Sequence, residues 1–194
     1  MWYTKVMEKN EPINPLVNIR EHAGLTQDYL SEVAGMSRMA IVRYEQALYV
    51  SPSTDYLSAL SECAWTAASI DASVDYLASQ YKDYRKRRIE ATIELFSRTE
   101  ETKKWTQYVA SDDSFWEVHP FISFRKMLAI ELGFPQSQIH FCMLTCFHPA
   151  QLDVFEKRRS GSSTIPRRLR DILLQADLPV GIIETEIAKY LKDD

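Results

Sequence analysis

The chain has 194 residues, 45% of them hydrophobic and 26% charged, which is enough for one or two small globular domains. A formal net charge of −4 argues against a protein that coats nucleic acid non-specifically. No apolar run is long enough to span a bilayer, and the first residues, MWYTKVMEKNEP, lack a signal-peptide core, so we expect no membrane association and a cytosolic location.

The first 50 residues have the spacing of three short helices. We expect the first helix to end at Gly24 and Thr26 to cap a second helix of about nine residues. Gly35 is suited to the left-handed conformation that ends a helix, and Ser37 then caps a third helix over residues 37–48. The expected apolar positions of the three helices are Leu16, Ile19, Ala23, Leu30, Val33, Ala34, Ile41, Tyr44 and Leu48.

Helical spacing continues through the rest of the chain. A fourth helix follows Pro52, and residues 71–104 have the pattern of one long linker helix. The polar stretch at 111–120 is the best domain boundary. Strand patterns are almost absent, so we predict an all-α fold with domains at residues 1–70 and 119–194, joined by a linker helix and loop over 71–118.

The long helix carries an apolar seam of coiled-coil spacing. Its members are Val74, Leu77, Tyr81 and Tyr84. The seam is compatible with pairing against a second copy in a homodimer and with packing inside its own chain, and the sequence leaves both open.

Two short helices separated by a tight glycine turn are typical of the helix-turn-helix. In that motif the first helix braces against the phosphate backbone and the second enters the major groove. The stretch LVNIREHAGLTQDYLSEVAGMSRMAIVRYEQ resembles the Cro/phage-repressor (XRE) family, with a match over about residues 13–65. The positions that fill the family pattern are Arg20, Gly24, Leu25, Thr26, Gln27, Leu30, Gly35, Ser37, Ile41 and Glu45.

The resemblance implies a set of DNA contacts. Gln27 would bond a phosphate, while Glu45 would fold back and have a structural role. An arginine facing the groove, such as Arg43, can hold guanine O6 and N7 with two hydrogen bonds. The alternative for Arg43 is a solvated pair with Glu45 or Gln46. The predicted DNA-binding residues are Gln27, Ser37, Arg38, Met39, Val42 and Arg43.

The C-terminal block SQIHFCMLTCFHPAQLDVFEK aligns with the first motif without a gap. This internal similarity predicts a second, degenerate helix-turn-helix over about residues 122–178. The segment FRKMLAIELGF then stands where VNIREHAGL stood, although a Pro-Gln insertion lengthens the connection by two residues. The alignment pairs Ser137 with Thr26, Gln138 with Gln27, Phe141 with Leu30, Cys146 with Gly35, His148 with Ser37 and Glu156 with Glu45.

The second motif differs from the first in chemistry. Its outward positions are Pro149, Ala150 and Val154, with Asp153 beside them, and a carboxylate in the groove repels phosphate. Two uses stay open, a second DNA-binding unit weak in base contacts or a shape converted to dimerisation, and the clustered arginines favour DNA. The corresponding candidate residues are Gln138, His148, Gln151, Lys157, Arg158, Arg159, Arg167 and Arg168.

Four residues invite comparison with a zinc site: His140, Cys142, Cys146 and His148. The alignment, however, makes Cys146 a turn residue and His148 an N-cap, and structural zinc usually joins two separated ligand pairs. We therefore expect no metal and no cofactor. The sequence also lacks a phosphate-binding glycine loop and a nucleophile elbow, so we do not expect an enzyme.

The sequence thus predicts a sequence-specific transcriptional regulator that binds double-stranded DNA, of the repressor kind that phages or plasmids encode, in the bacterial cytosol. The alternative is an antitoxin or adaptor whose C-terminal domain dimerises or binds a protein partner. A plasmid partition or transfer factor that binds repeated sites is a third, weaker alternative.

Overall fold

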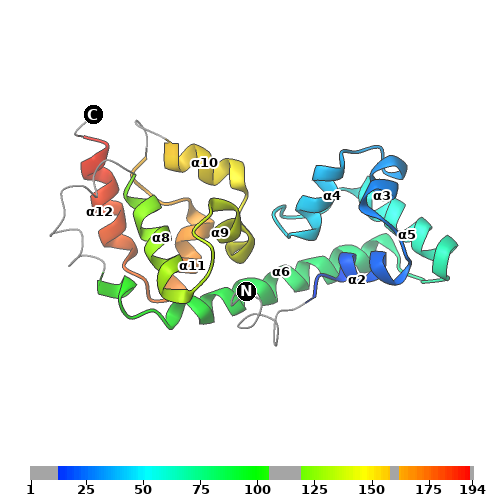
Figure 1. Cartoon of the computed structure of the whole chain (residues 1–194), viewed down its shortest axis with the longest axis horizontal. Helices are drawn as coiled ribbons and strands as arrows, with labels where there is room; N and C mark the ends of the chain where they lie inside the picture. Colours follow the sequence, from blue (N-terminus) through cyan, green and yellow to red (C-terminus); the bar gives the residue numbers. More distant parts are fainter. Residues whose placement is uncertain (1–12, 105–118, 158–161, 193–194) are drawn as a thin grey trace. The chain divides into compact units, whose positions relative to one another are not determined.

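The computed structural model describes residues 13–104, 119–157 and 162–192, and all regular structure in these ranges is helical (Figure 1). The predicted all-α fold is therefore confirmed. The chain divides into two compact units, Asn10–Arg88 and Ile89–Asp194, with the division inside a helix. Within the described ranges, no helix is long and apolar enough to cross a membrane. Most of the loop expected at 111–120 lies outside these ranges.

The N-terminal unit opens with the predicted succession of short helices. Thr26 Oγ1 accepts a hydrogen bond from the backbone N–H of Tyr29, and Ser37 Oγ accepts one from Ala40, so both predicted N-caps are confirmed. Gly35 has φ +63°, the left-handed conformation expected of it. The helices are α2 (Pro15–His22), α3 (Gln27–Val33), α4 (Arg38–Glu45), α5 (Thr54–Ala68) and the first part of α6 (Val74–Ser97).

One predicted core position of this unit is wrong. Leu30 and Ile41 are fully buried, as expected, but Val33 is 46% exposed. A step of three residues along a helix turns the side-chain direction by about 60°, so Val33 does not point in the same direction as the buried Leu30. Because Val33 is also the last residue of α3, no further turn covers it.

The long helix is shorter than predicted. It ends at Ser97, and a 3₁₀ helix, η1 (Thr102–Lys104), follows it. Glu131 accepts hydrogen bonds from the backbone N–H groups of Glu100, Glu101 and Thr102, which directs the chain away from helical bonding. The prediction of a continuous helix over 71–104 is therefore wrong at both ends.

The apolar seam of α6 is covered by its own unit. Leu77, Tyr81 and Tyr84 are each at most 3% exposed within the chain. Tyr81 also donates its hydroxyl to the carbonyl of Tyr49, 32 residues away in sequence. These three side chains are buried without a second copy, so burial of the seam does not require the coiled-coil dimer.

The C-terminal unit has a core rich in phenylalanine. The Phe121 ring meets Phe141 edge-on at 5.9 Å and Phe155 at 5.3 Å between centroids. Thr92, on the later part of α6, donates its hydroxyl to the Leu144 carbonyl at 2.7 Å. The remaining helices of this unit are α8 (Pro120–Leu132), α9 (Gln138–Thr145), α10 (Pro149–Lys157), α11 (Arg167–Gln175) and α12 (Val180–Tyr190).

Candidate nucleic-acid interface

The helix α4 has one buried and one exposed side. Ile41 is fully buried, whereas Met39 is 56% exposed and the side chains of Arg38 and Arg43 are also exposed. Val42 is half-buried between the two sides. The predicted groove-facing residues therefore share an outward surface, and a long apolar side chain stands between two cations on it.

The two arginines of α4 have different partners. Arg38 forms an ion pair with Asp28 of α3 at 3.1 Å, in which both side chains are mostly exposed. Arg43 donates from Nη1 to the hydroxyl of Tyr49 at 3.3 Å. The alternative pairing of Arg43 with Glu45 is wrong, because the Glu45 carboxylate lies on the inner side of the helix. An exposed ion pair such as that of Arg38 contributes little to stability, so its release toward a phosphate or base costs little.

A buried polar network fixes the two helices of the motif against each other. Arg20 donates from Nε to Glu45 Oε1 at 2.5 Å and from Nη2 to Oε2 at 3.2 Å. Gln27 Nε2 donates to the same Oε2 at 2.7 Å. The structural role expected for Glu45 is therefore confirmed. Gln27, expected at a phosphate, is bonded to Glu45 here, which uses one of its two amide N–H bonds.

The network also favours the charged form of Arg20. Burial by itself disfavours the charged guanidinium, but the hydrogen bond and the negative charge of Glu45 outweigh it and raise the pKa of Arg20. Arg20 Nη1 further donates to the carbonyl of Leu25 at 3.0 Å, directly before the cap of α3. One guanidinium thus orients the start of α3 and the end of α4.

Two residues that bond to the backbone at and after the end of α4 were not predicted from the sequence. Asn14 donates from Nδ2 to the carbonyls of Tyr44 and Glu45. Arg85 donates to the carbonyls of Ala47 and Tyr49 and is only 4% exposed, so it is not part of a surface patch made by the run RKRR. Its place four residues after Tyr81 could have shown that it lies on the buried side of α6.

The C-terminal unit contains the same network, atom for atom. Arg125 donates from Nε and Nη2 to the two carboxylate oxygens of Glu156, at 2.9 and 3.3 Å. Gln138 Nε2 donates to Glu156 Oε2 at 2.9 Å. Arg125 Nη1 donates to the carbonyl of Gln136 at 2.6 Å, again the residue directly before a helix cap. Gln138 and Glu156 are two of the residues that the internal alignment pairs with the first motif.

The arginine of this second network comes from a different register. Arg20 stands four residues before Gly24, while Arg125 stands eight residues before Gly133, one helical turn earlier. The two-residue insertion after Gly133 lengthens the connection to α9. An arginine one turn further back on the same side of its helix then reaches the equivalent carbonyl, which the gapped alignment did not reveal.

The turn of the second helix pair follows the alignment closely. Cys146, which takes the place of Gly35, has φ +50°, and the Nδ1 atom of His148 accepts a hydrogen bond from the Ala150 backbone N–H at 3.2 Å.

The side chains compared with a zinc site do not have the features of metal ligands. Burial, with a smaller contribution from Glu156, raises the pKa of Cys142 to about 12, so its thiol stays protonated at neutral pH. No group of three or more metal-ligating side chains occurs within residues 13–104, 119–157 and 162–192.

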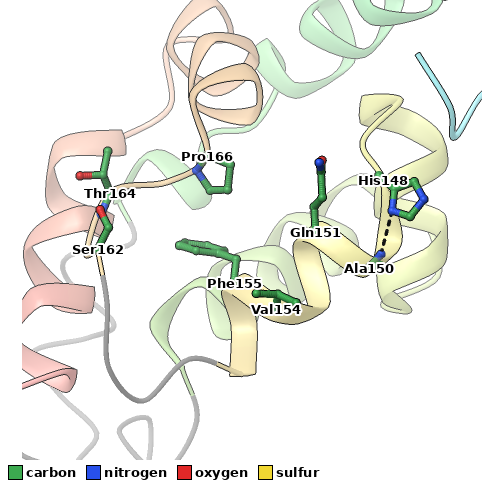
Figure 2. A pocket seen from close by; sticks show the side chains of 8 residues that line it. All are labelled: His148, Ala150, Gln151, Val154, Phe155, Ser162, Thr164 and Pro166. Carbon is green, nitrogen blue, oxygen red and sulfur yellow. Dashed lines mark hydrogen bonds between the residues drawn. The ribbon is translucent and has the colours of Figure 1, made fainter. Parts of the chain in front are cut away.

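The outward side of α10 is more apolar than that of α4. Ala150 is exposed and Val154 is 50% exposed. Beside them lies an open pocket of about 620 Å³, lined on its other side by Thr164 and Pro166 (Figure 2). Figure 2 shows the Phe155 ring extending from α10 into the space between that helix and the segment that carries Ser162, Thr164 and Pro166.

The cations predicted to grip DNA near α10 and α11 are unequally available. Arg167 is exposed, whereas Arg168 is half-buried. Lys157 pairs with Asp153 at 2.9 Å on the surface of α10. Arg158 and Arg159 lie outside the described residues.

A comparison with protein families places the first motif. Residues 16–63 match the family model described as Helix-turn-helix, which covers α2 to most of α5. No curated protein and no solved structure matches the chain. The family consists of DNA-binding transcription regulators that are generally not enzymes. Residues 16–63 are therefore a helix-turn-helix DNA-binding domain of the Cro/C1 type.

Proposed function

We propose that the protein is a sequence-specific repressor of the phage or plasmid kind, which reads double-stranded DNA in the major groove with α4 and blocks a promoter. The observation that carries this proposal is the outward side of α4. There Arg38, Met39 and Arg43 are exposed, with Met39 and Arg43 opposite the buried Ile41, on a helix whose inner side is fixed by Glu45.

The outward residues have chemistry suited to base edges. The guanidinium of Arg43 can donate two hydrogen bonds to guanine O6 and N7, and the Met39 side chain can contact a thymine methyl group. Gln27 keeps one amide N–H for a phosphate while the other stays on Glu45. Ser37 caps α4, so its backbone lies where the positive end of the helix dipole favours a phosphate.

For the C-terminal unit we propose a second helix-turn-helix that binds the DNA backbone and reads bases weakly. The repeated arginine–glutamate–glutamine network supports this architecture. The apolar outward side of α10, with Asp153 neutralised by Lys157, offers few donors to bases. Gln138, His148, Gln151, Arg167 and the neighbouring cations would contact phosphates.

An antitoxin or adaptor function is the second candidate. The half-exposed Val154 and the pocket beside it favour a protein partner, because apolar surface of this kind contributes little to binding of a phosphate backbone. In that case the N-terminal unit binds DNA and the C-terminal unit holds the partner or a second copy.

Selection of duplexes from a random pool by the full-length protein, followed by sequencing, tests the proposal. A repressor is expected to enrich one discrete motif, and to protect a site containing it from nuclease at low protein concentration. Enrichment of no motif, with an affinity that depends on salt alone, would contradict sequence-specific binding. A motif bound only after another protein is added would favour the adaptor.

A further inference from the structure

The segment after α4, residues 47–49, forms an unusual turn that is hydrogen-bonded to side chains of α6. Ala47 has φ +59°, a left-handed conformation that costs a residue with a side chain about 1 kcal/mol or more. The Ala47 side chain is fully buried, so the turn packs against the unit instead of extending into solvent. A strained turn of this kind keeps its shape only where its surroundings fix it.

Arg85 of α6 supplies much of that fixation. Its Nη1 donates to the carbonyl oxygens of both Ala47 and Tyr49. Tyr81, one turn earlier on α6, donates its hydroxyl to the same Tyr49 carbonyl at 2.9 Å. The Ala47 and Tyr49 carbonyls follow the C-terminal end of α4, whose partial negative charge favours a nearby cation.

The turn after α4 also fixes the side chain of Tyr49. Its ring lies against Tyr44 with centroids 5.0 Å apart, and Tyr44 stacks on Tyr56 at 5.2 Å and 12°. At the exposed end of this series, the Tyr49 hydroxyl accepts the hydrogen bond from Arg43 Nη1 at 3.3 Å. Two buried side chains of α6 thus connect, through the backbone of Tyr49, to the guanidinium on the outward side of α4.

We propose that Arg85 is a positioning residue for base recognition, because it fixes the turn that holds the Tyr49 hydroxyl against Arg43. This inference rests on the proposed function of α4. The bond to Tyr49 uses Nη1 and leaves Nε and Nη2 for two hydrogen bonds to a base. A long side chain held at one nitrogen gives up less rotational freedom when it makes the two remaining hydrogen bonds.

The test compares base preferences of full-length variants by selection and sequencing. Arg43→Ala first identifies the base pair that Arg43 reads. Tyr49→Phe removes only the hydroxyl, and Arg85→Met removes the cation that fixes the turn. Arg87→Met is the matched control, since Arg87 is exposed on the same helix and loses the same charge.

The inference predicts a loss confined to one base pair. A bidentate contact discriminates by roughly tenfold to a hundredfold, and we expect Tyr49→Phe and Arg85→Met each to reduce the preference at the Arg43 base pair about tenfold. Preferences at the other positions should stay as in the unmodified protein. Arg87→Met should leave the preference at the Arg43 base pair unchanged, and Arg85→Lys should recover part of it.

Two outcomes would overturn the inference and are separable from failure of the proposed function. If the unmodified protein selects no motif, the proposed function fails. If it selects one and Tyr49→Phe retains full preference at the Arg43 base pair, the positioning role of Arg85 is wrong. Tyr49→Phe decides this even where Arg85→Met fails to fold, because the Tyr49 ring and the buried cation both remain in place. A uniform loss across all positions in Arg85→Met, with no change in Tyr49→Phe, would likewise reduce Arg85 to a structural role.

Discussion

Arg125 donates two hydrogen bonds to Glu156, and only 5% of each side chain is exposed. If either side chain were removed, water could not reach the remaining charge to solvate it. In the N-terminal unit, Arg20 and Glu45 have the same relationship, with 11% and 7% of the side chains exposed. The same kind of buried ion pair therefore joins α2 to α4 in one unit and α8 to α10 in the other.

Breaking the more deeply buried pair should destabilise the C-terminal unit strongly. Arg125→Met leaves the Glu156 carboxylate with Gln138 as a partner, and we expect a loss of about 3–5 kcal/mol in the free energy of unfolding. Arg125→Met combined with Glu156→Leu should recover much of this loss, because no buried charge remains. Denaturant unfolding of the four members of this cycle measures both values. A double variant as unstable as the sum of the single variants would contradict the account.

Two glycines should respond to alanine in opposite directions. Gly35→Ala places a side chain at φ +63°, and since no atom lies within 4 Å of the added Cβ, the expected loss of about 1 kcal/mol comes from the backbone alone. Gly181 lies in α12, also with nothing within 4 Å and no positive φ, and Gly181→Ala should stabilise by about 0.5–1 kcal/mol. Unit-resolved amide hydrogen exchange measures each change. Stabilisation by Gly35→Ala would show that the helix turn at Gly35 is not left-handed.

The stability of the C-terminal unit should fall between pH 6.5 and 4. His119 is 3% exposed, and burial lowers its pKa to about 4. Its Nδ1 accepts the Phe121 backbone N–H, so the folded state holds the ring neutral while the unfolded chain takes up a proton below about pH 6.5. The unfolded state therefore binds more protons in this range, which costs about 1.4 kcal/mol per pH unit at most.

A variant isolates the contribution of His119 from the other titrating groups. His119→Asn keeps a side-chain acceptor at the start of α8 but removes the titrating ring. It should be less stable at pH 7, because no ring then packs against Phe155 and Tyr190, yet its stability should vary less between pH 6.5 and 4. Equal slopes in the two proteins would mean that His119 takes up its proton as readily in the folded state as in the unfolded chain, so that its pKa is not lowered.

The helix pattern and caps of the first motif could be predicted because they depend on neighbouring residues. Thr26, Gly35 and Ser37 act through backbone bonds within three or four residues, and such local rules are visible in a sequence. The exposure of Val33 could not be deduced as easily, because it depends on where α3 ends. The end of α6 depends on Glu131, which is about 30 residues away and belongs to another helix.

The exposed residues of the candidate site could be predicted from the sequence, but the buried residues that hold α4 and α10 in place could not. Periodicity places Arg43 opposite the buried Ile41, and the structure has both Arg43 and Arg38 exposed. Periodicity could have placed Arg85 on the buried side of α6, but it does not identify its partners, which are carbonyl oxygens that any residue provides. The role of Arg125 was hidden for a related reason, since a longer connection shifts the register by one turn and the gapped alignment sets Ala129 opposite Arg20.

Neutralising the C-terminal cations should test whether the second unit binds DNA. A variant in which four arginines are changed to glutamine is expected to have a nuclease footprint that is shorter at one end. The four are Arg158, Arg159, Arg167 and Arg168. The same change should reduce the slope of affinity against salt in proportion to the phosphates that these cations neutralise. The two units carry different outward residues, so the full footprint should be asymmetric. A footprint of full length combined with loss of self-association would assign this unit to dimerisation.

Methylation interference at guanine N7 tests whether α4 reads guanine in the major groove. On the selected duplex, methylation of particular guanines should block binding of the unmodified protein. Arg43→Ala should lose sensitivity at one of these guanines and keep it at the others, because its hydrogen bond to N7 is absent. An interference pattern that is the same in both proteins would contradict the assignment of Arg43 to the groove.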